Sequence, residues 1–185
     1  MSQSEINFNK KTILITGGAG FIGSNLAFYL QNNFPDSKIV VFDCLRNEKK
    51  LPNGNLVSFG HYKNLIGFKG RIIAGNINNK IDLDKLNEYQ FDFIFHQAAI
   101  SDTRLYDQEL VMQTNVNSFY DLLKFAKKNS STLVYASSAA TYGSSTSPQV
   151  VGVEYPENPY GYSKYAMDQL AMDFSKNNSN MVISG

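Results

Sequence analysis

Short stretches that are almost wholly apolar alternate along the chain with longer stretches in which apolar residues recur at helical spacing. The apolar stretches are residues 12–16, 38–42, 71–74, 91–95, 132–136 and 181–184. Short runs that are apolar at nearly every position are typical of parallel strands covered on both faces. We therefore expect six strands in one parallel sheet.

The stretches between the expected strands have the pattern of helices. We predict helices at residues 21–32, 82–88, 108–128 and 160–177, and Pro159 suits the start of the last one. The third has an apolar face formed by Leu110, Val111, Thr114, Phe119, Leu122, Leu123 and Phe125. The alternation predicts an α/β fold of the Rossmann type, a doubly wound parallel sheet with right-handed crossovers.

Two stretches fit neither pattern. Residues 44–70 are rich in Asn, Gly and Lys, and residues 143–158 are rich in Ser and Pro. Loops of this length in a compact domain are more often functional than idle. Since the sequence holds no internal repeat and no interdomain linker, we expect residues 1–185 to form one domain.

Composition narrows the class of protein. A net charge of +1 gives no electrostatic reason to expect binding to nucleic acid or to an anionic membrane. No apolar run is long enough to cross a bilayer, and residues 1–11 lack the apolar core of a secretory signal. Cys44 is the only cysteine, so we expect no internal disulfide and no metal site. These features predict a cytoplasmic protein.

The first expected strand runs directly into a glycine-rich turn. Gly17, Gly20 and Gly23 fit G-x-x-G-x-x-G, while Gly18, Gly20 and Gly23 fit G-x-G-x-x-G. Glycines at this spacing permit a tight bend, a close approach of the backbone to a pyrophosphate, and close packing of helix on strand. The N-terminus of the next helix adds free N–H groups and partial positive charge. This context favours a dinucleotide site over a glycine-rich turn without a ligand.

The end of the second strand bears on the choice of cofactor. Asp43 lies 20 residues after Gly23, where a carboxylate can bind the 2′-hydroxyl of NAD. Arg46 could instead pair with the 2′-phosphate of NADP, or it could be a solvated loop cation. These residues leave NAD and NADP open.

Further candidates follow the third and fourth strands. Asn76 and Ile77 could flank the adenine. After the fourth strand, the segment Gln97, Ala98 and Ala99 is small enough for its backbone to contact the cofactor. We expect Cys44 to be a packed residue at the end of a strand and His96 to be structural, since no acid or serine marks a catalytic triad.

Tyr160 and Lys164 are candidates for proton transfer. They are spaced i and i+4 on the fourth expected helix, so their side chains share one face. An ammonium group roughly 4 Å from a phenol is worth about 4 kcal/mol at an effective dielectric constant of 20, which could lower the phenol pKa from about 10 by up to about three. Such a phenol could act as a general acid and base, while Lys164 binds the nicotinamide ribose. The spacing alone would also fit an ordinary surface pair.

A serine pair favours the catalytic interpretation. The fifth expected strand ends at Ser137 and Ser138, on the edge of a parallel sheet where ligands bind. We expect Ser138 to hold an alcohol oxygen and to orient it towards Tyr160. The alternative is that both serines only cap the end of the strand.

Four runs carry a family resemblance over essentially the whole chain: residues 11–27, FHQAAISDT at 95–103, YASSAATYG at 135–143 and YGYSK at 160–164. With them the chain resembles the extended short-chain dehydrogenases/reductases, the NAD-dependent epimerase/dehydratase family. The resemblance implies a Rossmann domain, bound NADP and a nucleotide-sugar substrate. It implies a catalytic acid/base at Tyr160. It also implies cofactor contacts at Phe21, Ile22, Asp43, Gln97, Ala98, Ala99, Ser101, Asn115 and Lys164.

Within this family the chain resembles the ADP-heptose 6-epimerases in particular. In such enzymes the cofactor takes a hydride from the sugar carbon, the transient ketone presents its other face, and the same hydride returns. The resemblance also implies a second catalytic lysine beyond the sixth strand and a C-terminal sugar-nucleotide lobe. We therefore expect the 185 residues to be truncated before that lobe. Asn76 stands where many relatives have aspartate, which weakens the expected adenine contact.

Two other interpretations stay open. The chain could be a non-catalytic NAD(P)-binding module, or another nucleotide-sugar epimerase or dehydratase such as a UDP-hexose 4-epimerase. The helices expected at 108–128 and 160–177 correspond to the pair that commonly forms a dimer interface in this superfamily. Their apolar residues can equally serve the core of the domain, so a homo-oligomer stays open.

Overall fold

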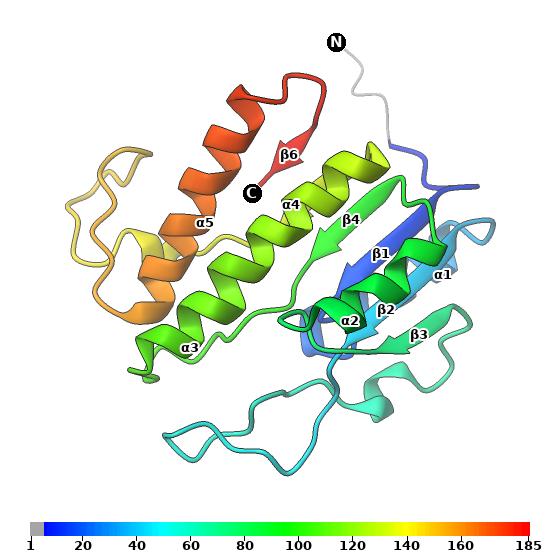
Figure 1. The fold of residues 1–185 in the computed structure, drawn as a ribbon, viewed down its shortest axis with the longest axis horizontal. Helices are drawn as coiled ribbons and strands as arrows, with labels where there is room; N and C mark the ends of the chain where they lie inside the picture. The colour runs from blue at the N-terminus through cyan, green and yellow to red at the C-terminus, as the bar shows by residue number, and fades with distance from the viewer. Residues whose placement is uncertain (1–5) are drawn as a thin grey trace.

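Six parallel strands form the sheet at the centre of the structure (Figure 1). The computed structural model describes residues 6–185. Across the sheet the strands follow the order β3-β2-β1-β4-β5-β6. Their bounds are β1 (Thr12–Thr16), β2 (Lys38–Asp43), β3 (Arg71–Ala74), β4 (Phe93–His96), β5 (Thr132–Tyr135) and β6 (Ile183–Ser184). The predicted doubly wound Rossmann sheet is confirmed.

The order of the strands reverses between β1 and β4. From β1 the chain moves outward through β2 to β3, and it then returns to the other side of β1 and moves outward again to β6. At the end of β1, Thr16 is paired with Phe42 on one side and with His96 on the other. In open parallel sheets, ligands bind at such a reversal, outside the carboxyl ends of the strands.

The helices follow the predicted stretches, with two interruptions. The α-helices are α1 (Phe21–Asn33), α2 (Lys80–Asp84), α3 (Gln108–Met112), α4 (Ser118–Asn129) and α5 (Pro159–Lys176). Short turns of other kinds are the 3-10 turns η1 (Tyr62–Leu65), η2 (Lys85–Glu88) and η4 (Ala139–Thr141) and the π-turn η3 (Gln113–Asn117). The helix predicted at 82–88 is thus α2 followed by η2, and the one predicted at 108–128 is split by η3. Within residues 6–185, no helix has the length and apolar character needed to cross a membrane.

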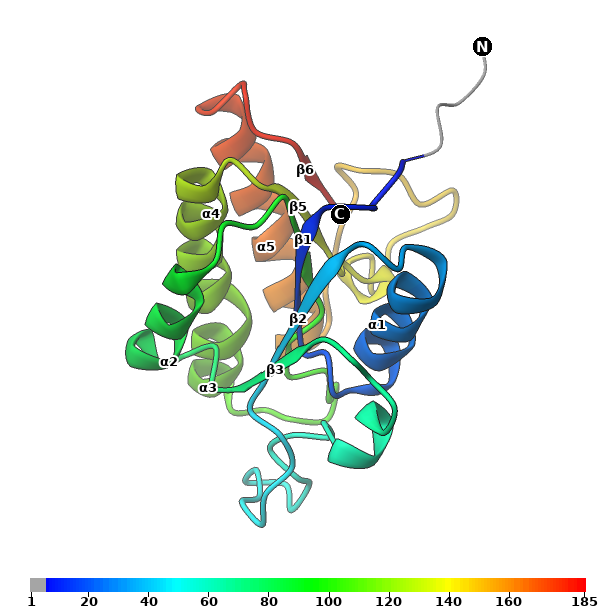
Figure 2. The ribbon, with the colours of Figure 1, turned by 90° about the vertical axis from the view of Figure 1, so that its right-hand side faces the viewer.

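Helices cover both faces of the sheet. In Figure 2, α1 lies on one side, and α2, α3 and α4 lie on the other. Successive strand residues point to opposite faces, so Leu14 packs with Phe119 of α4 in one cluster, while Ile15 packs with Leu30 of α1 in another. Both side chains are fully buried. Because β1, β2 and β4 each supply side chains to both clusters, these central strands are apolar at nearly every position.

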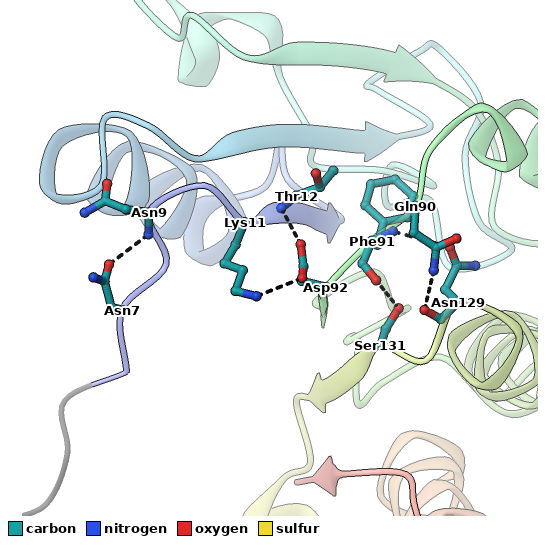
Figure 3. Close-up of polar contacts among 9 residues, drawn as sticks. All are labelled: Asn7, Asn9, Lys11, Thr12, Gln90, Phe91, Asp92, Asn129 and Ser131. Atoms are coloured by element: carbon teal, nitrogen blue, oxygen red, sulfur yellow. Dashed lines mark hydrogen bonds and ion pairs between the residues drawn. The ribbon is translucent and has the colours of Figure 1, made fainter.

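Short hydrogen-bonded turns close the amino-terminal edge of the sheet (Figure 3). The Asp92 carboxylate accepts bonds from the N–H of Thr12 at 2.9 Å and from the ammonium of Lys11 at 3.0 Å. The side-chain carbonyl of Asn129 accepts the N–H of Phe91 at 3.3 Å. Hydrogen bonds within the chain hold this edge together. The candidate residues lie at the opposite edge.

Candidate active site

The glycine-rich turn lies between β1 and α1, at the carboxyl edge of the sheet. Gly17 has a φ of +69°, a left-handed conformation that favours glycine. A Cβ at this position would lie 2.6 Å from the backbone nitrogen of Ala98, in the loop after β4. A Cβ at Gly23 would collide with the carbonyl oxygen of Gly17. The turn therefore needs glycine at both positions.

The N-terminus of α1 opens at this turn without a side-chain cap. Gly20 precedes the helix, and no side-chain hydrogen bond caps it. Phe21 and Ile22 in the first helical turn are 83% and 64% exposed. An uncapped N-terminus offers N–H donors and partial positive charge, so this end of α1 fits an anionic group such as a pyrophosphate.

Asp43 ends β2 beside the turn. Its side chain is buried, and its carboxylate accepts the N–H of Ala19 at 3.0 Å and that of Leu45 at 2.8 Å. Burial raises the pKa of Asp43, and the two N–H bonds oppose that rise. A carboxylate offers about four acceptor sites, so this group can hold the glycine turn and still accept bonds from ribose hydroxyls.

The two residues singled out after Asp43 both face solvent. Cys44 is exposed, so the expectation of a packed residue there was wrong. The reason is that Cys44 lies one residue beyond the end of β2, whose last five residues are all buried. Arg46 is also exposed, and its backbone N–H donates to the carbonyl of Gly60 at 2.6 Å. This position is compatible with both of its predicted roles, pairing with a phosphate and solvation.

The candidates after β3 and β4 differ in exposure. Asn76 and Ser101 are exposed, whereas Ile77 is buried in the core cluster beside Leu86. The side chain of Ile77 thus supports the loop from below. Half-buried residues at the end of β4 are Gln97, Ala98 and Ala99.

His96 is a structural residue, as predicted. Its ring is buried, stacks on Phe119 at 5.6 Å between centroids, and places Nδ1 2.7 Å from the hydroxyl of Thr16. Burial, with a smaller effect of the Lys164 charge, lowers the pKa of His96 to about 3. The ring is therefore neutral at any pH at which the protein would work.

Asn115 lies in the π-turn between α3 and α4 and is fully buried. Its carbonyl oxygen accepts the N–H of Ile100 at 2.8 Å. Its amide donates to the carbonyl of Ile100 and to the hydroxyl of Ser163, both at 2.9 Å. Asn115 therefore ties the loop after β4 to α5, and its direct cofactor contact stays a prediction.

Lys164 is buried beneath the end of β5. Only 3% of the residue is exposed, and its ammonium donates to the carbonyl of Ala136 at 2.7 Å. The ammonium lies 5.9 Å from the centroid of the Tyr160 ring, one turn earlier on α5. Burial lowers the pKa of Lys164 to about 8, although the negative charge of Asp168 opposes this. Tyr160 and Lys164 share one helix face, as predicted.

Ser138 lies three residues beyond the end of β5, in the segment that packs on α5. Its hydroxyl accepts the N–H of Ala140 at 3.2 Å and so begins η4. α5 packs closely on η4, since a Cβ at Gly161 would lie 2.5 Å from the carbonyl oxygen of Ala140. Asn158 caps α5 through the N–H of Gly161 at 2.8 Å. These contacts explain the glycine within YGYSK, whose role the sequence analysis missed.

Sequence analysis also missed how the long loop after β2 is held. We call residues 46–60 the strap. Its Leu51 is buried against Ile100 and Leu105 of the loop after β4, and the amide of Asn53 donates to Asp102 at 2.9 Å. Asn55 makes a second amide bond to the same carboxylate. The strap therefore joins the loops after β2 and β4, which flank the glycine turn.

Comparison with known proteins assigns the chain to a family. Residues 13–184 match the model of the NAD dependent epimerase/dehydratase family. The chain is similar to the crystal structure of ADP-L-glycero-D-manno-heptose-6-epimerase of Helicobacter pylori, with a TM-score of 0.86 and 47% identity over 99% of this chain and 56% of that one. It is 35% identical over 176 residues to the enzyme of the same name from Brachyspira hyodysenteriae, covering 94% of this chain and 52% of that protein.

A third relative is more distant. The dTDP-glucose 4,6-dehydratase of Bacillus anthracis, solved in complex with NAD, is 27% identical with a TM-score of 0.74 over 94% of this chain and 53% of that one. The chain thus spans about half the length of the relatives that it matches. A family match over nearly all of the sequence, on a reversing parallel sheet with a glycine turn, shows that this chain belongs to the NAD dependent epimerase/dehydratase family.

Proposed function

We propose that this chain is the cofactor-binding part of a nucleotide-sugar epimerase, and that its substrate is an ADP-heptose inverted at C6. One observation carries the proposal: the glycine turn follows the carboxyl end of β1, and the segment with Ser138 and the Lys164 ammonium bonded to Ala136 follow the carboxyl end of β5, at the same edge of the sheet. His96 lies between them on β4, paired with Thr16 of β1 on one side and with Tyr135 of β5 on the other. The two heptose epimerases among the relatives support the choice of sugar.

The residues present fit a nicotinamide dinucleotide. The cradle at Gly17 and Gly23 is space that a Cβ would fill, and the uncapped end of α1 suits a pyrophosphate. Asp43 retains acceptor capacity for a ribose. When bound, the nicotinamide supplies the site with a hydride acceptor and donor. We propose NADP as the natural cofactor, with Arg46 beside the 2′-phosphate, and NAD as the weaker ligand.

The catalytic residues would divide the proton chemistry among them. Ser138 holds the oxygen of the substrate hydroxyl, and Tyr160 removes its proton and later returns it. Lys164 stabilises the negative charge that develops on the phenol oxygen and binds the nicotinamide ribose. The carbonyl of Ala136 orients the Lys164 ammonium for both tasks.

Incubation of the purified chain with NADP and ADP-D-glycero-D-manno-heptose tests the proposal. Inversion at C6, followed by NMR, is the result that supports the proposal, and Tyr160→Phe should abolish that inversion while the Kd of NADP changes by less than about twofold. Tyr162→Phe is the matched control, because Tyr162 lies two residues along α5 and is 51% exposed. Full turnover by Tyr160→Phe would rule out the catalytic role of its hydroxyl.

A second candidate is a non-catalytic NAD(P)-binding module, for which the glycine turn and the uncapped end of α1 are sufficient. Cofactor binding without inversion of any sugar would support it. Turnover of UDP-glucose in place of ADP-heptose would instead indicate a hexose 4-epimerase. Calorimetric titration with NADP and with NAD, run alongside, separates the two cofactors.

A further inference from the structure

A carboxylate fork lies beneath the proposed catalytic group. Tyr135 donates its hydroxyl to one oxygen of Asp168 at 2.7 Å, and Ser137 donates its hydroxyl to the other oxygen at 2.7 Å. Both lengths are those of charge-assisted O–H···O⁻ bonds. Asp168 lies on α5, one helical turn beyond Lys164. None of these three side chains has a part in the chemistry proposed above.

The fork completes a three-point clamp on the end of β5. Tyr135, Ala136 and Ser137 are consecutive, and each is bonded to α5. The outer two donate to Asp168, while the carbonyl between them accepts from Lys164 at 2.7 Å. Ser138 is the next residue along the chain. The clamp therefore sets the separation between the strand end that carries Ser138 and the helix that carries Tyr160 and Lys164.

Charge gives the fork a second role. Burial of the Lys164 ammonium costs free energy, and the negative charge of Asp168 compensates in part by raising the pKa of Lys164. Other groups that face Lys164 are Tyr160 of α5 and the neutral ring of His96 on β4. Burial and the Asp168 charge raise the pKa of Tyr135, so this hydroxyl stays a hydrogen-bond donor.

We propose that Asp168 is a positioning residue that locks the Ser138 end of β5 onto α5 and supplies the counter-charge of Lys164. The proposal rests on the proposed function for its catalytic meaning. Its two physical effects, the clamp and the counter-charge, are measurable in the chain without turnover and without cofactor. Failure of the proposed function therefore leaves the test intact.

The counter-charge is tested by Asp168→Asn, which keeps the shape of the side chain and removes the charge. Titration of Lys164 by NMR in lysine-labelled chain, assigned with Lys164→Met, should show that the pKa of Lys164 falls by about 1. Asp173→Asn is the control on the same helix, because Asp173 pairs with Lys176 at an exposed site. Titration of Lys164 at the same pH in both variants would overturn the counter-charge role.

The clamp is tested by the double variant Tyr135→Phe with Ser137→Ala, which keeps the Asp168 charge. The backbone N–H of Ala136 donates to the carbonyl of His96 at 3.2 Å, so its hydrogen exchange reports on the end of β5. We expect exchange to become about tenfold faster, while the titration of Lys164 stays unchanged. Unchanged exchange would overturn the clamp. This test does not use Asp168→Asn, so it still applies if that variant does not fold.

Discussion

The two edges of the sheet are built in opposite ways. At the amino-terminal edge the connections are short, with residues 34–37 joining α1 to β2 and residues 130–131 joining α4 to β5. At the carboxyl edge the chain runs through residues 44–61 between β2 and η1, and through residues 136–158 between β5 and α5. The same six strands reach both edges, so packing of the core does not explain why the connections differ in length. Long loops at one edge only are what a binding site requires.

Ionisable groups follow the same division. At the amino-terminal edge, Lys11 and Asp92 form an ion pair whose side chains are 43% and 38% exposed, where water solvates both charges. At the carboxyl edge, Asp43, His96 and Lys164 are each at most 5% exposed. Within residues 6–185, the Nε2 atom of His96 has no hydrogen-bond partner. Burying such groups costs stability, and the carboxyl edge accepts this cost to hold its side chains in a fixed arrangement.

The largest effect on cofactor binding is expected from Gly17→Ala. The new Cβ would lie 2.6 Å from the backbone nitrogen of Ala98, and the alanine would have to adopt a φ of +69°. Backbone strain of about 2–3 kcal/mol at the pyrophosphate cradle should weaken NADP binding by about 100-fold. Calorimetric titration of the variant measures the loss.

Gly54→Ala is the control for Gly17→Ala. Gly54 also has a positive φ, +85°, but a Cβ there meets nothing within 4 Å. We expect a loss of stability of about 1 kcal/mol from the backbone and no change in the Kd of NADP. Equal losses of binding in the two variants would show that the loss in Gly17→Ala is not specific to the glycine turn.

An effect on stability, and not on cofactor binding, is expected when Lys164 loses its proton. Its pKa is about 8 in the folded chain and 10.5 ordinarily, because burial disfavours the ammonium. Between these two pH values the unfolded chain keeps a proton that the folded chain has released, so the free energy of unfolding rises with pH there. The rise over the whole window amounts to about 3 kcal/mol. Below pH 8 the contribution is constant.

Denaturant unfolding at several pH values measures this rise. Lys164→Met removes the titrating group, so the rise between pH 8 and 10.5 should be missing from the variant. Lys176→Met is the control, because the side chain of Lys176 is 75% exposed and should leave the rise in place. Parallel pH profiles for the wild-type chain and Lys164→Met would contradict the burial of the ammonium as the source of the effect.

Elements governed by local periodicity could be predicted from the sequence. The bounds of α1 and α5 agree with the predicted 21–32 and 160–177 to within a residue, because apolar spacing, a glycine turn and Pro159 mark them. The split of residues 108–128 was not predictable in this way. The π-turn places Asn115 where it bonds Ile100 and Ser163, and those partners are distant in sequence.

For the candidate site, the positions of residues that belong to a known motif could be predicted. The glycine turn, Asp43 and the Tyr160–Lys164 pair lie where the motifs place them. Contacts between loops carry no such signal: nothing near Asp102 or Asp168 marks either as a hub of hydrogen bonds. Their partners come from residues 53–55 and 135–137, and only the folded sheet brings these segments together.

The smallest effect is expected at the amino-terminal edge, from Lys11→Ala. The variant loses only an exposed ion pair with Asp92, and such pairs contribute about 0.2–1 kcal/mol to the free energy of unfolding. The carboxylate keeps its bond to the N–H of Thr12, so the turn stays closed. We expect unfolding to show this small loss at low salt, a smaller one at high salt, and no change in the Kd of NADP. A change in NADP binding of tenfold or more would mean that the two edges are coupled through the strands, and the contrast between a structural edge and a functional edge would fail.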